Sequence, residues 1–171
     1  MSMLDFQHDI LPLKNIIFRT ALRIVLNKEE AEDIVQDILL KLWERRRELE
    51  GVENLEAFAL TMARNLAIDR KEKMDNRHVT LDQRTHDQTD EESPNADSLL
   101  MAQEKDRFIA NAINSLPEKQ RCILQLRDIE GKTYKEIATM LNITESDVKV
   151  SLFRARNEIK EKIIQKKLLF L

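Results

Sequence analysis

Apolar residues recur every three or four positions along most of this 171-residue chain. That spacing is typical of helices that bury one face against a core. Three such stretches cover roughly 7–26, 29–48 and 54–74, and the pattern resumes near Leu99 and continues to the C-terminus. With 2 Gly, 3 Pro and 5% aromatic residues, the composition offers few turn or strand formers. The chain is therefore predicted to be all-α.

The helical pattern breaks over residues 75–98, where Asp, Asn, Thr, Gln and Ser collect around a proline. This segment holds seven acidic and two basic residues, whereas the formal net charge of the whole chain is only −3, so the remainder is slightly basic. Few apolar residues and excess charge of one sign are typical of a solvated linker. We therefore expect two small helical domains, at 1–74 and 106–171, joined by an acidic flexible linker at 75–105.

Two helix starts lie close together in the C-terminal domain. Ser115 with Glu118 is predicted to begin one helix, and Gly131 to end it. Thr133 with Glu136 has the spacing of a capping box, which predicts the start of a second, short helix.

A third helix start follows at once. Asn142 is predicted to form the tight turn, because Asn tolerates a left-handed backbone, and Thr144 with Asp147 begins the last helix. One face of that helix is apolar, through Val148, Leu152, Ala155, Ile159 and Ile163. The opposite face mixes small, polar and apolar groups, with cations on its shoulders, which suits base edges and phosphates. Short helix, turn and long helix together predict a DNA-binding helix-turn-helix; a plain amphipathic helix with a solvated face is the alternative.

The second helical stretch, EEAEDIVQDILLKLW, has an unusual outer face. An acidic and polar stripe there ends in two large apolar residues; its members are Asp33, Gln36, Asp37, Leu40 and Trp43. Exposed aromatic residues are typical anchors of protein interfaces, so the stripe indicates a protein contact. The alternative is a solvated stripe with Trp43 covering the core.

The third stretch, LEAFALTMARNLAIDRKEK, is predicted to bury Phe58, Ala59, Met62 and Leu66. Its other side becomes polar and basic toward the end, through Arg64, Asn65, Asp69, Arg70, Lys71 and Lys73. Cations near a helix C-terminus also complement the helix dipole, so this feature alone does not assign a function.

Taken together, these pieces resemble the extracytoplasmic-function (ECF) sigma factors of bacterial RNA polymerase, in the sigma-70 family. AEDIVQDILLKLW with AFALTMARNLAIDRKEK resembles region 2 of that family, and SLPEKQRCILQLRDIEGKTYKEIATMLNITESDVKVSLFRARNEI resembles region 4. The resemblance covers roughly 10–74 and 106–165. It implies a factor that binds core RNA polymerase, recognises promoter −10 and −35 elements and aids promoter melting. It also implies a partner anti-sigma factor, which in this family is often membrane-bound.

The resemblance assigns roles residue by residue. The stripe Asp33, Gln36, Asp37, Leu40 and Trp43 would dock on the clamp helices of the polymerase β′ subunit, and region 4 on the β flap. The −10 contacts would be Arg64, Asn65, Asp69, Arg70 and Lys71, and the loop at 45–54 would capture a flipped base. The −35 contacts would be Thr144, Ser146, Asp147, Lys149, Val150, Ser151 and Arg154.

This chain departs from the family pattern at two places in the last helix. Ser146-Asp147 stands where the family often has Gly-Thr, and Ser151 stands where it often has Arg. An acidic side chain cannot donate to a phosphate, although it can cap a helix or accept from a cytosine amine. We therefore expect an atypical −35 sequence.

Two other functions remain as alternatives. The first is a stand-alone helix-turn-helix regulator that binds DNA without polymerase. The second is an enzyme or metal protein, for which the candidate ligands are His78, His86 and Cys122; both histidines lie in the linker, and no cluster has ligand spacing. We therefore expect no enzyme activity, metal, cofactor or small-molecule substrate.

Two further features bear on the protein's setting. Cys122 is the single cysteine and lies in an apolar helical run, which predicts a buried, inert thiol. No apolar run approaches the roughly 20 residues that span a membrane, and acidic residues interrupt the first ten positions, unlike a signal peptide. A cytoplasmic protein is expected.

Overall fold

The computed structural model describes residues 3–78 and 97–169. Every regular element in these two ranges is helical, which confirms the predicted all-α class. The α-helices are α1 (Lys14–Val25), α2 (Lys28–Glu44), α3 (Leu55–His78), α4 (Asp97–Asn114), α5 (Glu118–Leu124), α6 (Tyr134–Leu141) and α7 (Glu145–Leu169). Short π- or 3₁₀-helical turns are η1 (Phe6–Ile10), η2 (Leu11–Leu13), η3 (Glu48–Gly51) and η4 (Gln125–Ile129).

The predicted first helix is divided in the structure. Residues 6–13 form the short turns η1 and η2, with Pro12 in η2, and α1 begins only at Lys14. α1 ends at Val25, and the next residue, Leu26, has a left-handed backbone (φ 56°) that allows an abrupt turn into α2. Asn27 caps α2 as predicted, and its side-chain oxygen accepts from the Glu30 backbone N at 3.0 Å. The predicted end of the first helix near residue 26 is therefore correct, although the left-handed backbone of Leu26 has no sequence signature.

The buried face of α3 differs from the predicted one. Ala59 is fully buried as predicted, and so are Ala63 and Ala67, whereas the predicted Phe58, Met62 and Leu66 are only partly buried. The three alanines recur every fourth residue and form one stripe, which lets the neighbouring helices approach closely. The prediction favoured large apolar residues and so placed the buried face one position away.

The predicted linker is shorter at both ends. α3 continues to His78, and α4 already begins at Asp97, so the edges of the expected 75–105 linker are helical. The ion pairs Lys71–Asp75 and Lys73–Asp69, each at 3.4 Å and four residues apart, support the end of α3.

The predicted helix boundaries in the C-terminal half are mostly correct. Thr133 and Glu136 form the complete capping box, and Asn142 has a left-handed backbone (φ 55°). Gly131, at φ 74°, ends the preceding segment. Ser115 is the exception: its hydroxyl donates back to the Ala112 carbonyl at 2.7 Å, so it belongs to the end of α4.

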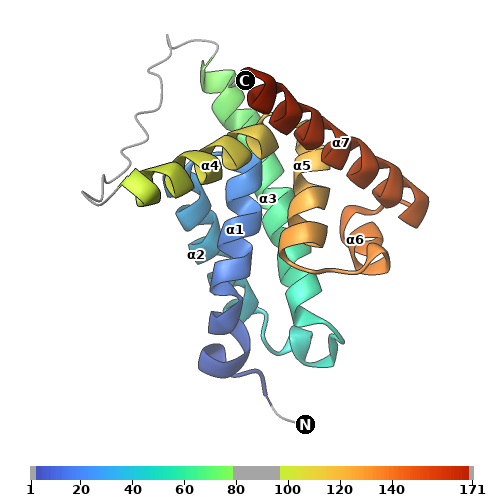
Figure 1. Cartoon of the computed structure of the whole chain (residues 1–171). Coiled ribbons are helices and arrows are strands. Elements are labelled where there is room, and N and C mark those ends of the chain that lie inside the picture. Colours follow the sequence, from blue (N-terminus) through green and yellow to red (C-terminus); the bar gives the residue numbers. More distant parts are fainter. Residues whose placement is uncertain (1–2, 79–96, 170–171) are drawn as a thin grey trace.

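The helices of the two halves pack against each other (Figure 1), and their buried residues form one continuous apolar core. α5 lies along α1, and α6 lies against α3. Arg121 of α5, which is buried, donates to the Ile24 carbonyl of α1 at 3.3 Å. Ion pairs reinforce the boundary: Arg19 bonds both carboxylate oxygens of Glu130, at 2.8 and 2.9 Å.

Candidate interaction surfaces

Most of the α2 stripe is exposed, and Asp37 within it is half-buried. Leu40 is 56% exposed and lies between Asp37 and Trp43, while the inner residues of the same helix are buried. Trp43 is held from two sides: the Phe6 ring meets it edge-on at 5.7 Å, and the Arg46 guanidinium lies 4.0 Å over its ring. A large apolar pair at one end of an acidic stripe is therefore presented in a fixed geometry, as an interface anchor requires.

The acids of this stripe are not free of partners. Arg70 of α3 reaches across and bonds Asp33 and Asp37, and its guanidinium also lies 3.4 Å from Glu30. Burial acts to lower the pKa of Arg70, but the hydrogen bond to Asp33 and the nearby carboxylates outweigh that effect, so its pKa is raised. The sequence placed Arg70 and the stripe in two different functional sets; the structure brings them together.

The other predicted −10 residues of α3 divide between two environments. Asn65 and Asp69 are exposed, whereas Arg64 points toward the C-terminal half and its Nε is buried without a partner. Arg64 lies near the Cys122 thiol, whose pKa is raised to about 12 mainly by burial. The buried, inert thiol predicted from the sequence is confirmed. In this packed arrangement Arg64 faces the other half of the protein rather than solvent.

The loop after α2 folds into the turn η3. Arg45 bonds Glu48 at 3.2 Å and lies 5.8 Å from the centre of the Phe58 ring. Asn54 closes the loop, because its side-chain oxygen accepts from the Ala57 backbone N at 3.0 Å. A cation over an aromatic ring offers a stacking surface for a base.

The exposed face of α7 carries two apolar side chains, Val150 at 44% and Phe153 at 66% exposure. Lys149 stands beside them, with its Nζ 5.5 Å from the centre of the Tyr134 ring. Ser151 does not share this face, because it is only 6% exposed. Phe153 was absent from the predicted site, although its position three residues after Val150 on the outer arc was a usable signal.

The first turn of α7 is tied to α5. Lys119 donates to the Asp147 carboxylate at 2.7 Å, and the Thr144 hydroxyl accepts from the Asp147 backbone N at 3.0 Å. The hydrogen bond from Lys119 is the main cause that lowers the pKa of Asp147. Asp147 therefore orients the helix within the protein, which gives a structural reason for this departure from the family pattern. Arg154 is exposed and lines a shallow polar pocket of about 460 Å³.

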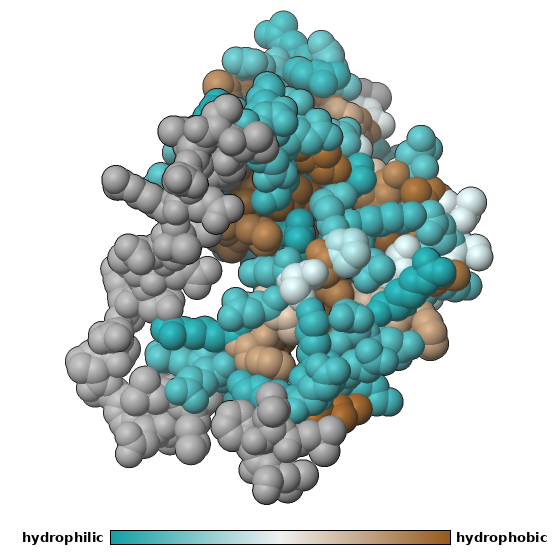
Figure 2. All heavy atoms as spheres, turned by 90° about the horizontal axis from the view of Figure 1, so that it is seen from above, coloured by the Kyte–Doolittle hydropathy of each residue, from teal (hydrophilic) through white to brown (hydrophobic). Residues whose placement is uncertain are grey.

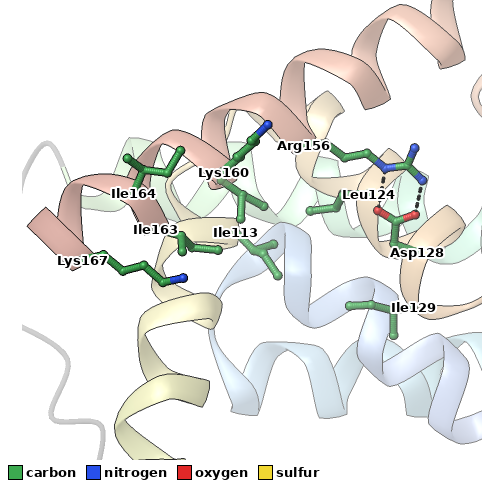
Figure 3. A pocket seen from close by; sticks show the side chains of 10 residues that line it. Ile113, Leu124, Asp128, Ile129, Arg156, Lys160, Ile163, Ile164 and Lys167 are labelled. Carbon is green, nitrogen blue, oxygen red and sulfur yellow. Dashed lines mark hydrogen bonds and ion pairs between the residues drawn. The ribbon is translucent and has the colours of Figure 1, made fainter.

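A groove of about 540 Å³ lies where α7 passes α4, α5 and η4, and the sequence did not indicate it (Figure 3). Its floor is apolar and its edge carries basic groups; the lining includes Ile113, Leu124, Ile129, Ile159, Ile163, Ile164, Arg156, Lys160 and Lys167. Arg156 is hydrogen-bonded to Asp128, with 3.0 Å between its Nε and the Asp128 Oδ2. An apolar floor with a cationic edge suits an amphipathic segment of a partner protein.

Elsewhere, the face seen in Figure 2 is mostly hydrophilic, with apolar residues exposed in separate patches. In the part of the chain that the structure describes, no helix is long and apolar enough to cross a membrane. Within the same residues, no group of three or more His, Cys, Asp or Glu side chains is arranged to hold a metal ion.

Comparisons with known proteins agree on one family. The family model described as Sigma-70 region 2 matches residues 10–77, and the one described as Sigma-70, region 4 matches residues 109–159. The ECF RNA polymerase sigma factor SigL of Mycobacterium tuberculosis is 32% identical over 82% of this chain and 78% of SigL. The RNA polymerase sigma-H factor of Pseudomonas aeruginosa is 29% identical over 93% of this chain and 82% of that protein.

Two solved structures share the fold. The sigma factor RpoE in complex with the anti-sigma factor NepR from Bartonella quintana has a TM-score of 0.72 at 23% identity, and the match covers 93% of this chain and 96% of that chain. CnrH in complex with the cytosolic domain of CnrY has a TM-score of 0.68 at 16% identity, covering 94% of this chain and 88% of that one.

Proposed function

This chain belongs to the sigma-70 family, among the ECF sigma factors of RNA polymerase, and from that premise we propose which of its surfaces perform each part of the task. As a member of that family it directs RNA polymerase to promoters and initiates transcription there. We assign it no catalytic chemistry of its own, because the polymerase makes the RNA. It acts in the cytoplasm, where the polymerase works.

The α2 stripe is the proposed contact with the β′ clamp helices of core polymerase, and it is the observation that carries the proposal. Asp33, Gln36 and Leu40 are exposed on one face, and Trp43 is fixed at its end by Phe6 and Arg46. A regulator that needed no polymerase would have no use for an ordered acidic and aromatic stripe remote from its DNA-binding helix.

Promoter contacts are proposed on two helices. The N-terminal domain, 1–74, takes the −10 element through α3 at Arg64, Asn65, Asp69, Arg70 and Lys71. The C-terminal domain, 106–171, takes the −35 element through Thr144, Ser146, Lys149, Val150 and Arg154. Since Asp147 and Ser151 are engaged within the protein, we give them a positioning role in place of base contact.

Two further protein contacts complete the proposal. The apolar groove beside α7 is assigned to the β flap, because its isoleucine floor and lysine edge fit an amphipathic segment. An anti-sigma factor is the proposed inhibitor; RpoE and CnrH, which share this fold, were both solved with a partner bound, and RpoE's is named as an anti-sigma factor.

The packed arrangement cannot contact both promoter elements at once. The −10 and −35 elements lie about 25 base pairs apart, which is roughly 85 Å at about 3.4 Å per base pair. A compact chain of this length has a radius of gyration of only about 15 Å. The two halves must therefore separate when the factor binds promoter with polymerase.

Reconstitution tests the proposed function. Purified chain is mixed with core RNA polymerase and genomic promoter fragments, and transcription starts are mapped. We expect specific starts that core alone does not give, and their loss in the triple variant Asp33→Asn/Gln36→Ala/Asp37→Asn. The variant Leu11→Ala, at an exposed apolar position outside the stripe, is the control and should retain them.

Two results would overturn the proposal. Absence of specific starts with the wild-type chain contradicts the sigma-factor role. Duplex DNA binding and regulation that persist in the triple variant, with polymerase association unchanged, would instead favour the stand-alone helix-turn-helix regulator.

A further inference from the structure

One guanidinium joins the proposed polymerase surface to the proposed promoter surface. Arg70 comes from α3, yet its bonds go to Asp33, Asp37 and Glu30 on α2. Its side chain is only 20% exposed, because the three carboxylates surround it. The residue expected to face DNA is therefore held against the stripe expected to face polymerase.

The other cations of the proposed −10 set are also engaged within the chain. Lys71 pairs with Asp75 at 3.4 Å, and Arg64 lies against the C-terminal half beside Cys122. Lys73, which lies one turn after Asp69 on α3, forms an ion pair with it. Among these cations of α3, Arg70 alone is paired with a second proposed binding surface. It is therefore the residue that can couple binding at the α2 stripe to DNA binding at α3.

We infer that Arg70 is shared between the two surfaces: in the free chain it is the counter-ion of the α2 stripe, and when polymerase engages Asp33 and Asp37 it is released to the promoter. The inference rests on the proposed function. Asp33, Asp37 and Glu30 already surround the guanidinium of Arg70. A nucleic-acid phosphate would have to approach these three carboxylates to reach it, and the repulsion between the anions makes the two contacts compete. Occupancy of one surface must therefore change the affinity of the other.

Thermodynamic linkage makes the coupling between polymerase binding and DNA binding reciprocal. If polymerase binding to the stripe raises the affinity of α3 for DNA, DNA binding to α3 raises the affinity of the stripe for polymerase by the same factor. Free chain then binds promoter DNA weakly, and the complex binds it more tightly without any new contact between polymerase and DNA. Arg70 is a positioning residue for polymerase docking as well as a DNA contact.

The test measures single-stranded DNA binding by the free, full-length chain. The probe is a labelled oligonucleotide carrying the non-template −10 region of a promoter mapped with the wild-type factor and core polymerase. Asp33→Asn/Asp37→Asn removes two partners of Arg70. Glu29→Gln/Glu32→Gln removes the same charge from exposed positions of α2 that have no bond to Arg70, and it is the matched control.

We expect the aspartate double variant to bind the oligonucleotide about fivefold more tightly than the glutamate control, which is the lower end of usual coupling factors. In an Arg70→Gln background the two double variants should bind equally, because no guanidinium remains to be released. A purely structural role for Arg70 would not produce this pattern, and circular dichroism verifies that each variant is folded.

In a second set of measurements, saturating core polymerase is added to each variant. The oligonucleotide binding of core polymerase alone is measured separately and subtracted. Wild-type chain should gain affinity on binding core, and Arg70→Gln should lose most of that gain, whereas Lys71→Gln should lower affinity equally with and without core. Equal binding by the two double variants, or an unchanged gain in Arg70→Gln, overturns the inference alone. Failure of the wild-type chain to bind core overturns the proposed function, and with it this inference.

Discussion

The α2 stripe and the exposed face of α7 are both built on single helices, but their charges are arranged differently. On α2, the acids Asp33 and Asp37 are matched by a cation from another helix of the same half. On α7, the flanking Lys149 forms no ion pair with a carboxylate among residues 3–78 and 97–169 and lies over the Tyr134 ring, while Val150 and Phe153 are exposed to solvent. A partner of α2 must displace an internal ion pair, whereas a partner of α7 meets groups that are already available.

This difference suggests how the two halves divide their work. Displacing a partly buried ion pair costs free energy unless the new partner satisfies the carboxylates, so the α2 stripe favours a specific cationic protein surface. Available cations beside apolar side chains suit phosphates and base methyl groups, which many DNA sites offer. The N-terminal half is thus proposed to select the polymerase, and the C-terminal half the DNA.

The largest effect is expected where the halves meet. Arg121 is buried and donates to the carbonyls of Asn114, Leu116 and Ile24, at 3.1, 3.1 and 3.3 Å. Arg121→Ala leaves three buried carbonyls without a donor and should reduce the free energy of unfolding by about 3 kcal/mol. Urea denaturation measures the loss, with exposed Lys135→Ala as the control. A loss below about 1 kcal/mol would show that the halves do not depend on this contact.

On the N-terminal surface, Trp43→Ala should weaken binding to core polymerase about 30-fold, because interface anchors are worth roughly 2 kcal/mol or more. Its ring is an exposed part of the stripe, so the fold should survive. Fluorescence anisotropy with labelled chain gives the affinity, and Leu11→Ala should match the wild type. Melting of the C-terminal half in Trp43→Ala would contradict separate roles for the two surfaces.

On the C-terminal surface, Lys149→Ala should weaken binding to a −35 duplex several-fold. It should also reduce the slope of log affinity against log salt by about one, as expected for one lost phosphate contact. Titration at several salt concentrations measures both quantities, and Lys28→Ala on the N-terminal half is the control. An unchanged salt slope would mean that Lys149 contacts no phosphate.

The smallest effect concerns acid stability, and it is expected in the C-terminal half. The backbone hydrogen bond at Thr133 is the main cause that lowers the pKa of Glu136. A folded pKa below the ordinary value of about 4.3 contributes stability above that pH and loses it as pH falls through the lowered value. Glu136→Gln removes the titrating carboxyl and should therefore flatten the fall in stability below about pH 4. An unchanged acid transition by circular dichroism would exclude this contribution.

Much of the fold could be predicted because it depends on local signals. The Thr133–Glu136 capping box, the left-handed Asn142 and the Thr144 cap are short-range features, and all three are present. The all-α class follows from composition and period alone. Of the α3 alanine stripe, Ala63 and Ala67 were missed because small buried residues have a weak hydrophobic signal. The left-handed backbone of Leu26 was missed because it depends on the packing of α1 against α2.

The site could be predicted only as separate sets of residues. Periodicity placed Asp33 and Asp37 on one outer face, but no periodicity within a helix can show that Arg70 of another helix bonds to them. The packing of the two halves is equally non-local: Arg19 and Glu130 are 111 positions apart in the chain. A tether between independent domains was therefore the simplest expectation, and the shared core appears only in three dimensions.

We propose that this chain spans two promoter elements with two halves that pack together when it is free. Energy transfer between labels at Glu29→Cys on α2 and Gln165→Cys on α7 measures this directly. The native Cys122 is buried and its raised pKa of about 12 keeps it unlabelled. We predict high transfer in the free chain and a large fall on adding core polymerase and promoter DNA, as the halves move toward a separation of roughly 85 Å. Transfer that stays unchanged while specific transcription proceeds would show that the halves stay packed on the promoter.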